Sequence, residues 1–285
     1  MALVVESFAS ATSTAGTITL TKPTGLAVGN LMVVMLSFAR NSVTNPEIQI
    51  AAGWTGVTAH GTFTSAAIQY RIADAADVAA SNFTFVSINQ VLVITAGRIL
   101  RISGHEPANI SLGSINLFTD SAAIDTAVTF SGSITTPVPD CLLVMAIACS
   151  DGIAATVSAQ QTTPASTLTE AYDHNGSTAI ALSGAYGFHN AVTTITQFGA
   201  TLSANLDNHA GVLLLIRAAF PFSGTNALLS VSPELFPQAG VGGTTGTNAL
   251  LTATPELFNQ NGLVLTPTVW TPKTKTPATW TPETK

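Results

Sequence analysis

Two short sequence units each occur twice in the last 62 residues of the chain. Residues 224–236 (GTNALLSVSPELF) return as residues 246–258 (GTNALLTATPELF), 22 positions later. Residues 266–275 (TPTVWTPKTK) return as residues 276–285 (TPATWTPETK), 10 positions later. A repeat protein usually needs at least about three stacked repeats before it buries a core of its own. Two copies of each unit are therefore expected to pack their apolar residues on a surface elsewhere.

Each copy carries a few apolar anchors in a polar or proline-punctuated setting. Such segments resemble recognition peptides, which contribute backbone hydrogen bonds and one or two pocket-filling side chains to a partner. Because a duplicated peptide predicts duplicated sites, we expect the anchors to dock on neighbouring subunits of a regular assembly. The alternative is a flexible Thr/Pro/Gly tail whose duplication is accidental. The predicted docking residues are Leu228, Leu229, Leu235, Phe236, Leu250, Leu251, Leu257, Phe258, Trp270 and Trp280.

Proline positions predict the local structure of these units. Ser232-Pro233-Glu234 and Thr254-Pro255-Glu256 each place a capping hydroxyl, a first-turn proline and an acid in order. Each triplet therefore predicts the start of one helical turn that carries Leu-Phe. The Thr-Pro decapeptides at the end of the chain are expected to be extended or polyproline-like.

Charged residues make up only 8% of the chain, whereas apolar residues make up 46%. Ordinary soluble domains have roughly 25% charged residues. A chain this poor in charge is expected to bury much of its surface against copies of itself or against partners, although a Ser/Thr-rich β surface gives the same figures. The net charge is −6 and no basic patch alternates with aromatic residues. We therefore expect no nucleic-acid partner.

The sequence predicts neither a membrane helix nor a secretory signal. The longest apolar runs, 31–35 and 141–149, are shorter than the roughly 18 residues of a spanning helix. The first residues (MALVVE) lack a basic region followed by a long apolar core. Cys141 and Cys149 fall on one predicted strand, roughly 26 Å apart at about 3.3 Å per residue, which is too far for a disulfide within that strand. Free buried thiols fit a reducing cytoplasm, and an intermolecular bridge is the alternative.

Strand patterns fill residues 1–220. Continuous apolar runs at 31–38 and 141–149 each follow a turn-forming stretch, and alternating runs at 66–72 and 179–188 come later in each half. A last apolar run closes each half, at 91–101 and at 211–217. These matched landmarks predict two similar four-stranded halves, with the continuous apolar strands central and the alternating strands nearer the edges. The short Ala/Asp stretch at 73–80 predicts one or two helical turns at an end of the sheets.

We therefore predict an all-β protein with two parts. Residues 1–220 would form a jelly-roll β-sandwich, in which two Greek keys fold into a double sheet, and are called the head below. Residues 221–285 would form an extended docking arm that contains both duplicated units, called the arm below. The boundary is placed where the composition shifts to Thr, Pro, Gly and Asn.

The search for catalytic and metal-binding residues gives no motif, so we predict no catalytic residue, no cofactor and no metal. The five histidines (His60, His105, His174, His189 and His209) have no metal-ligand spacing, and the two cysteines form no C-x-x-C pair. Residues 173–176 (DHNG) are first of all a hairpin turn. A weaker calcium alternative uses aspartates in predicted loops, namely Asp120, Asp125, Asp140, Asp151 and Asp207.

Four aromatic residues of the head invite a second interpretation. Trp54, in Gly-Trp-Thr at a strand start, could stack on a sugar, but it is more typical of a core or end plug. Tyr70, Tyr172 and Tyr186 lie on alternating strands, where one face is the core. A surface glycan is therefore kept as an alternative partner.

Several stretches of the sequence together resemble a β-rich accessory domain of tailed-bacteriophage virion proteins. The stretches are 22–34 (KPTGLAVGNLMVV), 53–55 (GWT), 67–73 (AIQYRIA), 83–85 (FTF) and 99–104 (ILRISG). The ends of the arm, at 270–275 and 280–285, resemble the Trp-Thr-x-x-Thr-Lys repeats that close some phage structural proteins. The resemblance implies a non-enzymatic virion component, made in the host cytoplasm and placed on the capsid surface or in a tail appendage.

Three classes of function are weighed from the sequence. The first is a homo-oligomeric virion structural protein that binds major capsid or tail proteins, with a capsid decoration or cement protein favoured over a tail fibre because the carboxyl end looks like the attachment. The second is a carbohydrate-binding module or adhesin. The third is a hydrolase, which would need an acid pair or a triad that the sequence does not display.

Overall fold

The computed structural model describes the head from residue 3 to residue 217. The described ranges are 3–39, 47–61, 63–88, 94–105, 115–150, 155–176 and 180–217, with the backbone alone at 115–125, 175–176 and 205–207. The chain divides into two units, Met1–Thr225 and Asn226–Lys285, and all described residues belong to the first. The predicted boundary at 220 and the arm lie outside the described residues.

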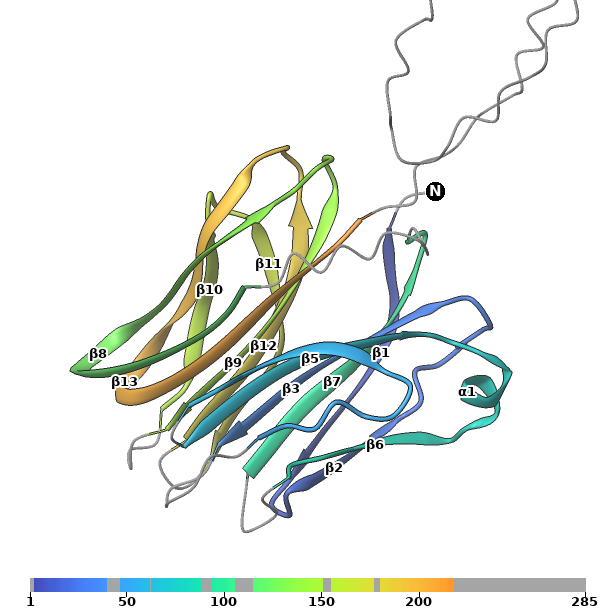
Figure 1. Cartoon of the computed structure of the whole chain (residues 1–285), viewed down its shortest axis with the longest axis horizontal. Coiled ribbons are helices and arrows are strands. Elements are labelled where there is room, and N and C mark those ends of the chain that lie inside the picture. The colour runs from blue at the N-terminus through green and yellow to red at the C-terminus, as the bar shows by residue number, and fades with distance from the viewer. Residues whose placement is uncertain are drawn as a thin grey trace, which may run out of the picture. The chain divides into compact units, whose positions relative to one another are not determined.

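The described chain is built almost wholly of strands (Figure 1), which confirms the all-β prediction. The strands are β1 (Val4–Ser13), β2 (Thr17–Thr21), β3 (Leu31–Ala39), β4 (Thr55–His60), β5 (Thr64–Ile72), β6 (Asn82–Val86), β7 (Ile94–Ser103), β8 (Ile115–Thr135), β9 (Cys141–Ser150), β10 (Val157–Thr163), β11 (Thr167–Gly176), β12 (Ile180–His189) and β13 (Thr194–Ile216). One short helix, α1 (Ala75–Ala79), lies between β5 and β6.

Two main antiparallel sheets are formed, one from each half of the described chain. The first main sheet has the order β1-β7-β3-β5-β4. The second has the order β10-β13-β9-β12-β11, and β8 also pairs with β13. Strands β2 and β6 form a separate ribbon. The continuous apolar strands β3 and β9 are central in their sheets, as predicted from their sequences.

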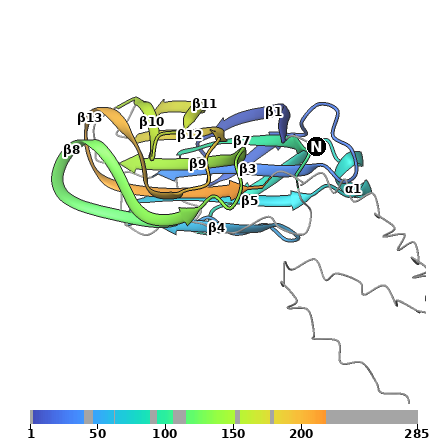
Figure 2. The ribbon, with the colours of Figure 1, turned by 90° about the horizontal axis from the view of Figure 1, so that it is seen from above.

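The two halves share one connectivity. In the first half β2 pairs with β6, and β1 pairs with β7 next to β3. In the second half one long strand, β8, takes the places of β1 and β2, and β13 takes those of β6 and β7. Figure 2 shows β8 and β13 bending together at one end of the sandwich. The sequence predicted separate strands at 193–202 and 211–217, whereas the backbone continues through both as β13 and bends where its register with β8 shifts, between Thr201 and Asn208.

The jelly-roll connectivity is not confirmed. A jelly roll folds two Greek keys into one double sheet. Here strands from residues 4–103 form the first main sheet and strands from residues 115–216 form the second. The coarser prediction of stacked antiparallel sheets is confirmed.

Three apolar layers hold the sheets together. The central layer lies between the two main sheets and includes Val33 of β3, Val144 of β9 and Leu214 of β13. An outer layer lies between β3 and the β2–β6 ribbon and includes Ile18 and Phe85. On the far side of the second main sheet, Phe130 and Phe198 come from the part of the β8–β13 ribbon that folds over β9. Both faces of β3 and of β9 are therefore covered, which explains why every residue of either strand is buried.

Local sequence signals account for the connections around β3. The Leu26 amide bonds the Pro23 carbonyl, and Gly25 has a φ of 72°, which an L-residue rarely adopts. A Cβ on Gly25 would also lie 2.2 Å from an Arg101 nitrogen. Helix α1 begins with a capping box between Asp74 and Asp77, and this confirms the helical turn predicted at 73–80.

The two halves also meet through a polar contact. The hydroxyls of Ser37 on β3 and Tyr172 on β11 lie 2.7 Å apart, and Ser37 also donates to the Ser183 carbonyl at 3.3 Å. Ser37 is fully buried. Its hydroxyl therefore needs these partners, because an unpaired buried hydroxyl is costly.

Removal of a buried ring should test the layer beneath the β8–β13 ribbon. Phe130 and Phe198 stack at 4.8 Å, and Phe130 occupies the space that a Cβ on Gly211 would take. We expect Phe130→Ala to lower the free energy of unfolding by about 3–5 kcal/mol in urea titrations, because it leaves a cavity in a closed layer. Val192→Ala, at a side chain that is 63% exposed, is the matched control and should change it by less than about 0.5 kcal/mol. Equal effects would contradict the layer assignment.

Tyr172→Phe should test the contact between the halves. We expect a loss of about 1 kcal/mol at neutral pH, because the hydroxyl bond to Ser37 is removed. Burial raises the pKa of the Tyr172 phenol above the pKa of about 10 that it has in the unfolded chain. The contribution of Tyr172 to the free energy of unfolding is therefore intact below about pH 10 and is lost as the pH rises above that value. Urea titrations should therefore show a steeper alkaline loss of stability for the wild type than for Tyr172→Phe. Tyr186→Phe serves as the control, and an unchanged alkaline slope in Tyr172→Phe would contradict the assignment.

Candidate functional site

The ten docking residues predicted from the sequence all belong to the arm. They lie outside the described residues, so their role stays a prediction. The described head offers two other features of interest, a pocket at the β10–β11 connection and an exposed edge at β1.

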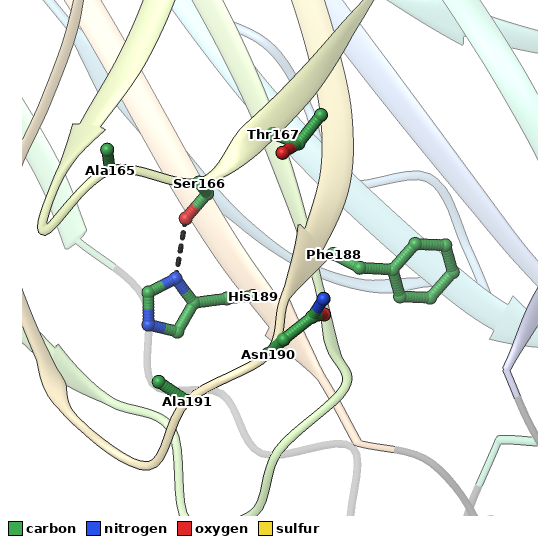
Figure 3. A pocket seen from close by; sticks show the side chains of 7 residues that line it. All are labelled: Ala165, Ser166, Thr167, Phe188, His189, Asn190 and Ala191. Atoms are coloured by element: carbon green, nitrogen blue, oxygen red, sulfur yellow. Dashed lines mark hydrogen bonds between the residues drawn. The ribbon is translucent and has the colours of Figure 1, made fainter.

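The pocket lies where the β10–β11 connection meets the end of β12. Its volume is about 260 Å³, and Figure 3 shows the residues that line it. They are Ala165, Ser166, Thr167, Phe188, His189, Asn190 and Ala191. Because side chains alternate along β12, Phe188 points away from His189 and packs in the central layer.

A chain of hydroxyls leads to the ring of His189. Ser166 Oγ lies 2.7 Å from His189 Nδ1, the contact that is dashed in Figure 3. Thr162 Oγ1 lies 2.8 Å from Ser166 Oγ and 2.7 Å from the Pro164 carbonyl oxygen. The Pro164 carbonyl and the His189 ring thus fix both hydroxyls, which ties the β10–β11 connection to β12.

His189 is held in the neutral form. Its side chain is 4% exposed, and burial lowers the pKa of the imidazole. Its Nε2 atom has no hydrogen-bond partner among the described residues, whichever ring nitrogen carries the proton. Cys141 lies directly opposite His189 in the β9–β12 ladder, and burial raises the pKa of its thiol, whose sulfur donates to the Val138 carbonyl.

The hydrogen bonds of this cluster join the β10–β11 connection to the end of β12. A serine or cysteine nucleophile is activated by a base that a third group orients in turn. The ring nitrogen that would take such a group is buried without a partner in the described structure, and the Cys141 thiol stays protonated. The sequence did not single out Ser166, and it gave His189 no role. Only the pairing of the strands reveals the contact between Ser166 and His189, because it brings together two residues that are 23 positions apart in the sequence.

The edge at β1 combines an exposed ring with a cation. Phe8 is 52% exposed, and the Arg98 guanidinium carbon lies 4.0 Å from the centre of its ring. Arg98 Nε donates to Ser10 Oγ at 2.8 Å. Burial lowers the pKa of Arg98, and nearby Tyr186, Tyr172 and Glu170 oppose that shift, Tyr186 most strongly. The sequence missed this pair, because Phe8 lies in an alternating run where one face is expected to be buried.

The aromatic residues of the glycan alternative pack mainly in the interior. Trp54 is half-buried and contacts Phe83 and Phe85 edge-on, with ring centres 5.9 and 5.2 Å away. Tyr70 packs against the central layer. These positions fit the plug interpretation of Trp54.

The aspartates of the calcium alternative are not gathered in loops. Asp120 and Asp125 lie within β8 and Asp207 lies within β13, because the two strands continue as a paired ribbon where the sequence predicted loops. Asp140 precedes β9 with a φ of 59°, and Asp151 lies outside the described residues. Among described side chains, no group of three or more His, Cys, Asp or Glu residues could hold a metal ion.

Strands β11 and β12 form a hairpin, but the prediction that residues 173–176 form its turn is wrong, because they lie at the end of β11 and pair with residues 180–183 of β12. The prediction of free buried cysteines is confirmed. Cys141 and Cys149 are buried and free. No helix in the described ranges is long and apolar enough to cross a membrane.

Comparison with known proteins gives no match. No protein-family model matches the chain, and neither curated proteins nor solved structures give a significant similarity. The resemblance to phage virion proteins therefore rests on the sequence stretches quoted above.

Titration of His189 should be visible in the stability of the protein. The pKa of His189 is lower in the folded protein than in the unfolded chain, where it is about 6.5. Its contribution to the free energy of unfolding is therefore present above about pH 6.5 and is lost as the pH falls through the folded pKa. Buried His105, whose pKa burial also lowers, adds to the same acid loss. We expect urea titrations between pH 7.5 and 5 to show a smaller acid loss in His189→Gln than in the wild type. Exposed His60 provides the control, His60→Gln, and equal slopes in both variants would contradict the burial argument.

Proposed function

We propose that this protein is a non-enzymatic structural protein of a tailed-phage virion, a capsid-associated decoration or cement protein that is anchored by its arm. The observation that carries the proposal is the join between the duplicated arm and the head. The arm follows β13, whose last residues Leu213–Ile216 are fully buried and pair with β9. A pull on the arm would be resisted by a strand in the middle of a sheet, rather than by a loosely held end.

The composition supports the same proposal. With 8% charged residues, the chain has few groups that favour a free, fully solvated surface. Large apolar side chains are exposed at several separate places in the head. They are Val4, Phe8, Val28, Ile72, Ile88 and Val192. Of these, Phe8 lies on β1 at the edge of the first main sheet, and it is the side chain that we expect to pack against a copy of the chain.

A tail-fibre or baseplate appendage is the nearest alternative within the virion. It uses the same head and the same arm, and it differs only in the partner that the arm binds. A cryo-EM map of the particle that shows where Trp270 and Trp280 lie would distinguish the capsid from the tail. The carbohydrate-binding alternative predicts exposed aromatic residues near Trp54, and the edge-on packing of that ring on Phe83 and Phe85 argues against it.

Deletion of residues 222–285 tests the anchoring role. In a host that produces the particle, we expect the truncated chain to be lost from gradient-purified particles, as measured by quantitative mass spectrometry. The head should keep its β-sheet circular dichroism, because the three apolar layers lie within residues 3–216. Deletion of 276–285 alone, which leaves one decapeptide copy, should give an intermediate level. Wild-type incorporation of the chain that lacks 222–285 would overturn the proposal.

A further inference from the structure

Strand β1 presents an edge that is open to another strand. It is the terminal strand of the first main sheet, and it pairs only with β7 among the described strands. From Ser7 to Ser13 its register with β7 is uninterrupted. Natural sheet edges are usually protected by short strands, prolines or lysines. The 10 residues of β1 contain neither proline nor lysine, and Glu6 is their single charged side chain.

Four other strands of the main sheets pair on one side only among the described strands, and each is less suited to accept a strand. Strand β8 carries Asp120 and Asp125, and its register with β13 shifts three times. Strand β4 has six residues. Strand β11 carries Glu170 and Asp173 and has a register shift after Glu170. Strand β10 has seven residues and also has a register shift. Strands β1 and β11 are equally long, with 10 residues each, but β1 carries one charged side chain where β11 carries two. Strand β1 therefore combines length with low charge, whereas β4 and β10 are uncharged but shorter.

Phe8 on β1 and Arg98 on the neighbouring strand β7 give this edge a chemical preference. Phe8 and Ser10 pair with Leu100 and Arg98, so Phe8 and Arg98 share one face of the sheet. Arg98 bonds Ser10 and lies over the Phe8 ring, and it has no carboxylate within salt-bridge distance in the described structure. A ligand with an extended backbone, one carboxylate and an apolar neighbour would complement all of these groups.

The duplicated units of the arm have that composition. Each begins with an uncharged stretch suited to a strand, 227–232 or 249–254, and continues with Pro-Glu-Leu-Phe. Glu234 is the single charged residue of the first unit, and Glu256 is that of the second. Each glutamate lies two positions before a phenylalanine, so one unit can bring a carboxylate and an aromatic ring to one place.

The length of chain beyond β13 allows this contact. Leu3, next to the start of β1, and Ile216, at the end of β13, both pack in the central layer. Figure 1 shows the start of β1 and the end of β13 at the same end of the sandwich. Six residues, 218–223, separate the last described residue from the first unit and can span at most roughly 20 Å. The second unit begins 22 residues further on and reaches much farther. One chain therefore carries two units but only one β1 edge, so at least one unit is free for another copy.

We propose that the β1 edge, with Phe8 and Arg98, is the docking site for the Pro-Glu-Leu-Phe units of the arm of a neighbouring copy. The 227–232 or 249–254 stretch adds as a strand along β1, Glu234 or Glu256 pairs with Arg98, and the Leu-Phe that follows covers Phe8. This inference rests on the proposed docking role of the arm and names its receptor.

A charge exchange in the full chain tests the proposal. Sedimentation velocity over a concentration series should show self-association of the wild type. We expect Arg98→Glu, and separately Glu234→Arg with Glu256→Arg, to weaken it at least about tenfold. The combination of all three substitutions should restore it to within about threefold, which a merely structural role of Arg98 would not predict. Phe8→Ala should also weaken association, and because the Phe8 side chain is exposed, the substitution should leave the fold intact.

Controls and a second readout make the outcome decisive. Glu283→Arg changes the acid of the terminal decapeptide, and Val28→Ala removes another exposed apolar side chain, so both should associate as the wild type does. Hydrogen exchange should show slower exchange of β1 amides in the associated chain. Association that survives both charge reversals, or that the triple variant does not restore, would overturn the proposal. Protection of β1 in a chain that stays monomeric would also overturn it, because the arm would then bind its own head.

The two proposals can fail separately. If the charge exchange fails but deletion of 222–285 still removes the chain from particles, the arm anchors the protein at another site. If the charge exchange succeeds but the deleted chain is still incorporated, the copies associate through β1 and the virion anchoring is wrong.

Discussion

The rest of the structure depends on the burial of β3 and β9 on both faces. Each strand is a run of apolar residues with no polar face to turn toward water, so a sheet that contains it must be covered twice. The two main sheets cover one face of each strand by packing together. The β2–β6 ribbon and the folded part of the β8–β13 ribbon cover the other faces. The layered arrangement therefore follows from the need to bury both faces of β3 and of β9.

Both halves cover their central strand in the same way, but the first half uses separate strands where the second half uses one continuous strand. In the first half, residues 14–16 separate β1 from β2 and let the chain pass from the main sheet to the covering ribbon. In the second half, β8 makes the same passage as one bent strand. Glycines lie at equivalent positions, since a Cβ on Gly97 would lie 2.8 Å from Leu36 and 3.4 Å from Ile18, and a Cβ on Gly211 would lie 2.5 Å from Phe130. The shared connectivity therefore reflects a shared packing need.

The polar groups of the interior have structural roles in this account. Ser37 and Tyr172 join the halves, and Ser166 and His189 fix the β10–β11 connection. Burial keeps the His189 ring neutral and the Cys141 thiol protonated. The docking site that we propose lies instead at the edge of the head, where Phe8 and Arg98 contact each other beside a strand that pairs on one side only among the described strands.

The sequence by itself determined the all-β class, the two central strands and the short helix. The apolar runs at 31–38 and 141–149 could only be buried strands, the stretch at 73–80 had the caps of a short helix, and the matched landmarks revealed two similar halves. These are local properties, set by side-chain periodicity and turn chemistry. Tertiary structure alone decided that each half builds its own sheet, that β8 and β13 run on through predicted loops, and that Ser166 meets His189 and Arg98 meets Phe8. Those outcomes depend on which strands pair and in what register, and strand pairing joins residues far apart in the chain that no local pattern connects.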